Sequence, residues 1–218
     1  MSEAPENRPA PRLYVGDADR ADLDRWLHEH DLAGKPLVLV QPGNKRTLKR
    51  GRAGQLGDDK TWPNERWAAL IHAVLARDPR IHVVLCGVAA EGAVLREIAR
   101  AADSERVIES SQELPLRRLL ALCERAIAMI SVDTGPAHAA AAMNCPLIVL
   151  YGAASPAQWL PRSPGGSAVI ALGGPPQRTR VAQIDLDEVL AAWAKLPLRL
   201  SVHKRSDEPG GDPFRPPR

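Results

Sequence analysis

The chain has 218 residues, of which 44% are hydrophobic and only 4% aromatic, so a folded domain with an aliphatic core is expected. A formal net charge of +3 falls well short of the basic excess of nucleic-acid-binding proteins, and we expect no nucleic-acid partner. The polar N-terminus lacks a secretion signal, and no apolar run approaches the ~20 residues of a membrane span. The composition therefore favours a cytoplasmic protein.

Both ends of the chain are rich in proline and charged residues. Residues 1–12 and 201–218 are predicted to be disordered, which leaves residues 13–200 as the folded domain.

Helices and strands are predicted to alternate along this domain. A helix carrying Leu23, Trp26 and Leu27 at helical spacing precedes an apolar strand at 36–43. The next helix begins near Asn64, a candidate N-cap. Further strands are predicted at 81–87, 106–110, 126–132, 146–152 and 167–172, with helices around 92–101, 116–124, 136–143 and 185–196. The last helix opens with Asp185 and Glu188 at capping-box spacing.

Continuous apolar strands separated by single helices indicate an α/β fold with a doubly wound, Rossmann-like parallel sheet. Such sheets bind ligands beyond the carboxyl ends of their strands. Polar clusters follow four predicted strands, at 41–63, 86–92, 131–138 and 151–159. We therefore expect the functional site at this edge.

The cluster SVDTGPAH, residues 131–138, has the composition of an anion site. Pro136 suits the first turn of a helix, where unpaired backbone N–H groups and the helix dipole favour a phosphate. Gly135 leaves room for close approach, while Thr134 and His138 can add side-chain donors. Asp133 would repel phosphate and is better suited to accept hydrogen bonds from sugar hydroxyls. An ordinary capped strand-to-helix turn with a packed histidine explains the same residues equally well.

Three cysteines, Cys86, Cys123 and Cys145, lie far apart in apolar surroundings and are expected to be buried free thiols. Their spacing fits no metal site, and we expect neither a metal nor a cofactor.

The stretch SVDTGPAHAAAAMNCPLIVLYGAASPAQWLP, with KTWPNERWAAL and LVLVQPG before it, resembles glycosyltransferase family 9, the heptosyltransferases of lipopolysaccharide core assembly. The matching blocks span roughly residues 13–195. The resemblance implies the C-terminal half of a GT-B enzyme, in which two Rossmann-like domains face a cleft and the C-terminal one binds the nucleotide-sugar donor. In the heptosyltransferases that donor is ADP-heptose.

The resemblance also implies roles for individual residues. Asp133 would contact the heptose hydroxyls, and Thr134, Gly135 and His138 would hold the diphosphate. Lys60 would lie near the donor phosphate and sugar. Glu91 would contact the ribose, although an exposed glutamate at a helix start is an equally good interpretation of that position.

The family reaction is an inverting displacement at the anomeric carbon, generally without an essential metal. Its general base belongs to an N-terminal acceptor domain that we expect to be absent, so we assign no catalytic residue. The acceptor, a lipopolysaccharide core or lipid A-type molecule, would bind through a missing or separate domain, with peripheral association with the inner membrane. The alternative is a non-catalytic nucleotide-binding remnant or one half of a split enzyme.

Asp17, Asp19 and Asp22 are expected to be solvated or capping residues.

Two further features have two interpretations each. The loop NKRTLKRGR, residues 44–52, is either a solvated loop or a basic lining of the donor cleft. Trp62 and Trp159 either pack under loops or flank the base or sugar.

Overall fold

The computed structural model describes residues 10–43 and 59–199. Its strands are β1 (Leu37–Gln41), β2 (His82–Leu85), β3 (Val107–Glu109), β4 (Ala128–Val132), β5 (Leu147–Tyr151) and β6 (Val169–Gly173). Its α-helices are α1 (Asp17–Glu29), α3 (Asn64–Arg77), α4 (Gly92–Ala102), α5 (Leu116–Arg125), α6 (Gly135–Ala142), α7 (Pro156–Trp159) and α8 (Leu186–Lys195). Two short 3₁₀ helices, η1 (Ala89–Glu91) and η2 (Val181–Gln183), complete the described elements.

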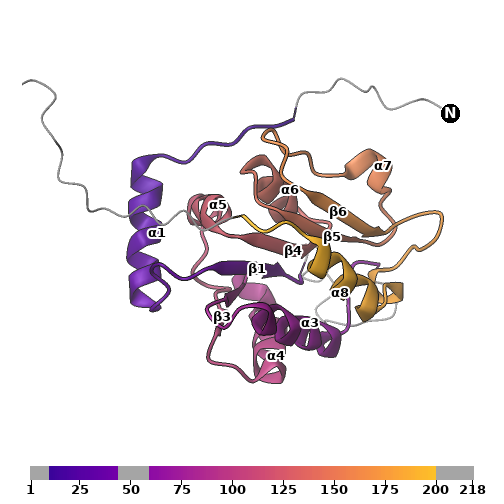
Figure 1. The fold of residues 1–218 in the computed structure, drawn as a ribbon, viewed down its shortest axis with the longest axis horizontal. Coiled ribbons are helices and arrows are strands. Elements are labelled where there is room, and N and C mark those ends of the chain that lie inside the picture. Colours follow the sequence, from indigo (N-terminus) through magenta and orange to yellow (C-terminus); the bar gives the residue numbers. More distant parts are fainter. Residues whose placement is uncertain (1–9, 44–58, 200–218) are drawn as a thin grey trace, which may run out of the picture.

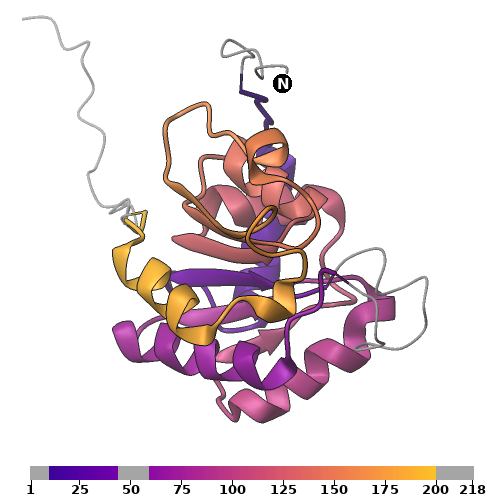
Figure 2. The ribbon, with the colours of Figure 1, turned by 90° about the vertical axis from the view of Figure 1, so that its right-hand side faces the viewer.

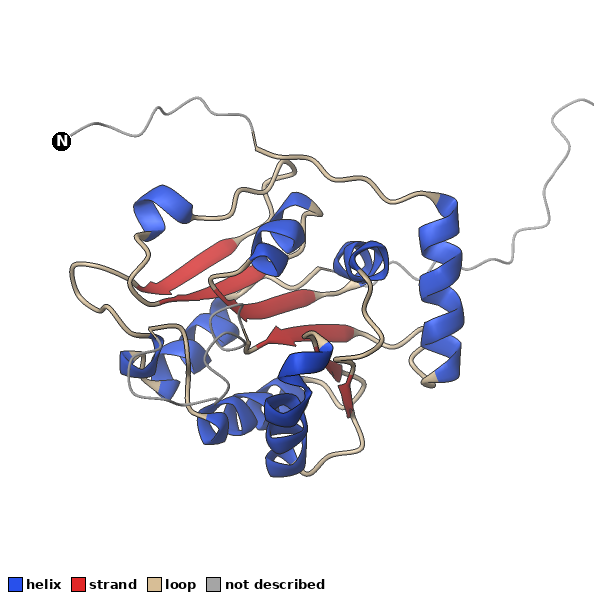
Figure 3. Cartoon of the chain, turned by 180° about the vertical axis from the view of Figure 1, so that it is seen from behind, coloured by secondary structure: helices blue, strands red, loops and turns tan. Residues whose placement is uncertain are grey.

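The six strands form one parallel sheet in the order β3-β2-β1-β4-β5-β6. Figure 3 shows the central strands side by side with a common direction. After β1 the chain adds β2 and β3 on one side and then returns to place β4 on the other side of β1. Ligands of such sheets bind where the order reverses, which here is between β1 and β4. The predicted doubly wound fold is confirmed.

Helices cover both faces of this sheet. On one face α3, α4 and α8 enclose a core that includes Trp67, Ile98 and Trp193. On the other, α1, α5 and α6 pack over a second core with Trp26 and Leu120. Figures 1 and 2 show the sheet between these two layers. Within the described ranges no helix is long and apolar enough to cross a membrane.

Local details differ from the sequence-based expectations at two helix starts, those of α3 and α6. Asn64 is the first residue of α3, whose N-cap is Pro63, so the predicted asparagine cap is wrong. Helix α6 begins one residue earlier than expected, at Gly135. Helix α1 begins at Asp17, because the Asp19 carboxylate accepts a hydrogen bond from the Gly16 N–H and caps the first turn.

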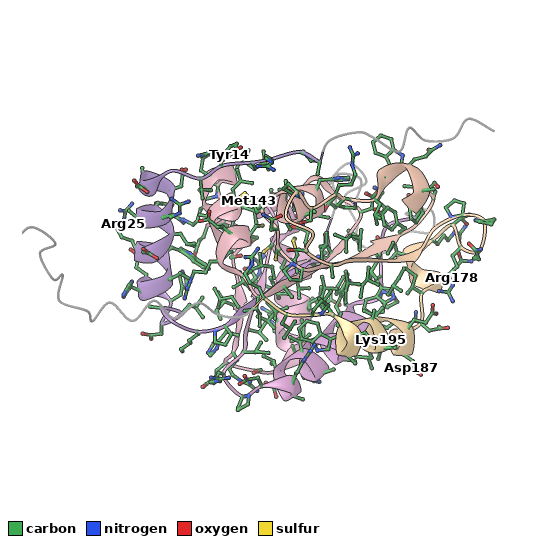
Figure 4. The ribbon with its side chains drawn as sticks, turned by 45° about the horizontal axis from the view of Figure 1, so that its top comes forward. Tyr14, Arg25, Met143, Arg178, Asp187 and Lys195 are labelled. Atoms are coloured by element: carbon green, nitrogen blue, oxygen red, sulfur yellow. The ribbon has the colours of Figure 1, made fainter. Side chains whose placement is uncertain are left out.

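Ion pairs attach α1 to α5. Asp19 pairs with Arg117, and Asp22 receives two bonds from Arg118, at 2.8 and 3.0 Å. These two aspartates are therefore not simply solvated, because each holds an arginine of the neighbouring helix. Arg25, on the outer side of α1 (Figure 4), also donates to Asp22, at 3.2 Å. The three cysteines are buried and free, as expected.

Candidate functional site

A buried carboxylate lies at the carboxyl end of β4, beside the reversal of strand order. Asp133, which is 8% exposed, follows β4 directly, and its backbone N–H binds the Leu150 carbonyl at 3.0 Å. The Lys60 ammonium donates to Asp133 Oδ2 at 2.6 Å and to the Asp133 carbonyl at 2.8 Å. A lysine from the loop after β1 and an aspartate after β4 therefore meet at the edge where the fold places ligands.

The N-terminus of α6 lies next to this ion pair. Thr134 is the N-cap and Gly135 the first helical residue, with Pro136 in the first turn. The Thr134 hydroxyl donates to the Val132 carbonyl at 3.2 Å, so the backbone N–H groups are the principal donors of this turn. A Cβ built on Gly135 would meet none of the described atoms outside its own turn within 4 Å. Gly135 is itself exposed, so the described residues leave the start of α6 accessible.

His138 lies beside the aspartate, one turn into α6. Its Nε2 is 3.9 Å from Asp133 Oδ1, and 40% of its side chain is exposed, so this histidine is not packed into the core. Burial lowers the pKa of His138 and Lys60 lowers it further, while Asp133 opposes the shift. The imidazole is accordingly neutral near pH 7 and can donate one N–H.

Glu91 is buried, at 4% exposure, against the ends of β1 and β2. Its Oε2 accepts the Val88 N–H at 3.0 Å, and a Cβ on Gly43 would lie 2.3 Å from its Oε1. Burial raises the pKa of Glu91, although the Val88 N–H and the Gln41 side chain moderate the shift. The interpretation of Glu91 as an exposed helix-start residue is wrong. A cavity of about 180 Å³ adjoins it.

The two tryptophans differ. Trp62 is 1% exposed, and its Nε1 donates to the Ile184 carbonyl at 2.9 Å, so Trp62 packs under its loop. Trp159 is 57% exposed, on α7. Its backbone carbonyl accepts a 2.8 Å hydrogen bond from the Tyr151 hydroxyl, which ties α7 to the end of β5.

Sequence reasoning missed Asp59 and Gly152. The Asp59 carboxylate accepts the Ala153 N–H at 3.1 Å, and its backbone carbonyl accepts the Val181 N–H at 2.8 Å. A Cβ on Gly152 would lie 2.0 Å from that carbonyl oxygen. No motif signals such contacts, because they join segments that are far apart in the sequence.

A larger cavity, of about 620 Å³, lies at the opposite, amino edge of the sheet. Its lining includes Arg77 and Arg199, whose guanidinium groups donate to backbone carbonyls at the ends of α8 and α5. These cations compensate carbonyl dipoles. The cavity also lies away from the strand ends where Asp133 and Lys60 meet, so the carboxyl edge remains the better candidate site.

Within the described residues, no group of three or more histidine, cysteine, aspartate or glutamate side chains is arranged to hold a metal ion. The basic cluster at 44–52 lies outside the described residues. The same holds for residues 1–9 and 200–218, which make up most of the predicted disordered ends.

Comparison with known proteins shows the family to which the chain belongs. The model of glycosyltransferase family 9 (heptosyltransferase) matches residues 3–188. The chain belongs to this family. Among relatives, lipopolysaccharide heptosyltransferase 2 of Escherichia coli K12 is 32% identical over 150 residues, covering 67% of this chain and 39% of that protein. Lipopolysaccharide heptosyltransferase 3 of the same strain is 33% identical over 125 residues, 57% of this chain and 33% of the relative.

Solved structures of family members share the fold. The E. coli ADP-heptose heptosyltransferase II superposes with a TM-score of 0.64 at 24% identity, over 88% of this chain and 54% of that one. The E. coli heptosyltransferase WaaC with ADP-2-deoxy-2-fluoro heptose gives 0.51 at 25% identity, over 74% and 43%. This family 9 chain thus matches between a third and about half of the length of these relatives.

Proposed function

We propose that this chain is the donor-binding part of a heptosyltransferase-like enzyme, which binds a nucleotide-diphosphate sugar of the ADP-heptose type for lipopolysaccharide core synthesis. The observation that carries the proposal is the meeting of Lys60 and Asp133 beside the open N-terminus of α6. That arrangement offers cationic and N–H donors for a diphosphate next to a carboxylate acceptor for sugar hydroxyls. Family membership and the WaaC complex with an ADP-heptose analogue support this choice of ligand.

Each site residue then has a role that fits its surroundings. Lys60, Gly135 and His138 hold the diphosphate, together with the backbone of Thr134. Asp133 accepts hydrogen bonds from the sugar. Glu91 contacts the ribose hydroxyls; since it stands at the ends of β1 and β2, next to the reversal point, it lies on the same edge as Asp133.

In inverting transfer an acceptor hydroxyl displaces the diphosphate from the anomeric carbon, and negative charge develops on the departing group. The Lys60 ammonium, the α6 N-terminus and the neutral His138 N–H are placed to stabilise that charge. No described residue is assigned as general base, and the acceptor site is assigned to a separate domain or chain. We place the reaction in the cytoplasm, with peripheral association with the inner membrane.

Calorimetric titration with ADP, and with UDP for contrast, tests the proposal. Tighter binding of ADP is expected; absence of binding would refute the donor site, and a preference for UDP would refute the adenine nucleotide. Asp133→Ala should keep ADP binding and lose discrimination between nucleotide sugars, whereas His138→Ala should weaken ADP itself. The reverse pattern would contradict these roles.

A further inference from the structure

We propose that Asp59 is a positioning residue of the nucleotide-sugar site, which holds Lys60 at the distance from Asp133 that diphosphate binding needs. This inference rests on the proposed function.

Lys60 lies on a loop, so neither a helix nor a strand fixes its backbone. Its ammonium nevertheless reaches Asp133 at 2.6 Å, in a pair whose side chains are only 17% and 11% exposed. A four-carbon side chain with free rotation places its charge reproducibly only if its backbone is held. The contacts of the neighbouring residues therefore determine whether the cation is preorganised for a ligand.

Asp59 supplies that hold from two directions. Its side chain binds the Ala153 N–H, just beyond β5, and its backbone carbonyl binds the Val181 N–H, at the start of η2. Gly152 packs against the same carbonyl: a Cβ on Gly152 would lie 2.0 Å from the Asp59 carbonyl oxygen. Asp59 thus joins the lysine loop to the end of β5 and to the start of η2.

The η2 segment that receives Asp59 is itself anchored. Arg178 makes two 2.6 Å bonds to the Glu188 carboxylate of α8, and Arg66 of α3 donates to the Ala182 and Ile184 carbonyls at 3.0 and 2.8 Å. Figure 4 shows Arg178 beside α8, the helix that carries Asp187 and Lys195. Because α3 and α8 both pack on the sheet, the support of Lys60 extends through Asp59 to the rigid core.

ADP and adenosine titrations of Asp59→Ala test this role, since adenosine lacks the diphosphate that Lys60 is proposed to hold. We expect about tenfold weaker ADP binding, in line with the sensitivity of sites to small displacements, and unchanged adenosine binding. Asp59→Asn keeps an oxygen that accepts the Ala153 N–H and should restore ADP affinity. Asp78→Ala is the matched control: Asp78 also accepts a backbone N–H, from Arg80 at 2.9 Å, but lies at the amino edge of the sheet. It should leave ADP binding unchanged.

The decisive comparison is made in a Lys60→Ala background. If Asp59 acts through Lys60, adding Asp59→Ala to Lys60→Ala should cost no further ADP affinity. Additive losses, equal losses for adenosine, or failure of Asp59→Asn to restore binding would overturn the inference. Should Asp59→Ala not fold, Asp59→Ser gives the same readout. A wild-type chain that fails to bind ADP refutes the proposed function, whereas normal ADP binding by a folded Asp59→Ala refutes this inference alone.

Discussion

Substituting Gly135 with alanine separates the donor-site interpretation of the α6 turn from a purely structural one. A Cβ at this position would meet none of the described atoms outside its own turn within 4 Å, and the residue does not have a positive φ. Alanine is also the better helix former, by up to about 1 kcal/mol in helix interiors and less at an end. Gly135→Ala should therefore keep, or slightly raise, the free energy of unfolding.

Binding should change in the opposite direction. The added methyl group would occupy the space proposed for the diphosphate, and overpacking of a well-fitted contact typically costs about 1–3 kcal/mol. At about 1.4 kcal/mol per factor of ten, this corresponds to roughly 5- to 150-fold weaker ADP binding.

Two measurements on the same preparation check this expectation. Urea denaturation gives the free energy of unfolding, and calorimetry gives the dissociation constant of ADP. Gly152→Ala is the opposite case, since its Cβ would collide with the Asp59 carbonyl and should lower both stability and ADP affinity. Full ADP affinity in a folded Gly135→Ala would show that the turn is only a helix cap, and the proposed diphosphate site would be wrong.

Three other predictions concern charges at the same edge. Lys60→Met removes the cation that pairs with the Asp133 carboxylate, whose side chain is only 11% exposed. It should lower the free energy of unfolding, measured by urea denaturation, by about 3 kcal/mol. A loss below about 0.5 kcal/mol would mean that the pair is effectively solvated. Glu91→Gln should raise the free energy of unfolding at pH 7.5, because burial raises the pKa of Glu91 and so penalises only its charged form. This gain in stability should shrink as the pH falls toward the ordinary glutamate pKa of 4.5. A gain independent of pH would contradict this cause. ADP affinity should rise as the pH falls below 7, because the pKa of His138 is lowered in the free protein and a bound diphosphate would raise it. Comparison with the pH profile of His138→Gln cancels the titration of ADP itself and isolates the rise due to His138. Identical pH profiles of the two proteins would remove His138 from the site.

The fold could be predicted because its signals are local. Each strand is a short apolar run and each helix a periodic one, so the alternation and the parallel sheet followed from the sequence. Helix starts were less predictable because the side chain that caps a helix need not stand at the N-cap position. Pro63 holds the N-cap position of α3 without a side-chain hydrogen bond, and Asp19 caps α1 from within its first turn. Asp19 and Asp22 also pair with arginines of α5, nearly a hundred residues away, which no local pattern encodes.

The candidate site also combines residues with local sequence signals and residues that only long-range contacts bring together. Residues 133–138 are contiguous, so the sequence predicted a strand-to-helix turn there, while leaving a ligand site and an ordinary capped turn as two interpretations of it. The contribution of Lys60 could not, because 73 residues separate it from Asp133. Family resemblance identified Lys60 and Glu91, but the burial of Glu91 and the support from Asp59 emerged only in three dimensions.

The Lys60–Asp133 pair has a consequence for the proposed recognition of a nucleotide sugar. In this structure the cation proposed for the diphosphate and the carboxylate proposed for the sugar neutralise each other. A diphosphate that attracted the ammonium would leave Asp133 with more capacity to accept hydrogen bonds from sugar hydroxyls, so the two proposed subsites would be coupled through one ion pair. A nucleotide sugar would then bind with a preference for its sugar that depends on Lys60, and that preference should diminish in Lys60→Met even where some ADP binding persists.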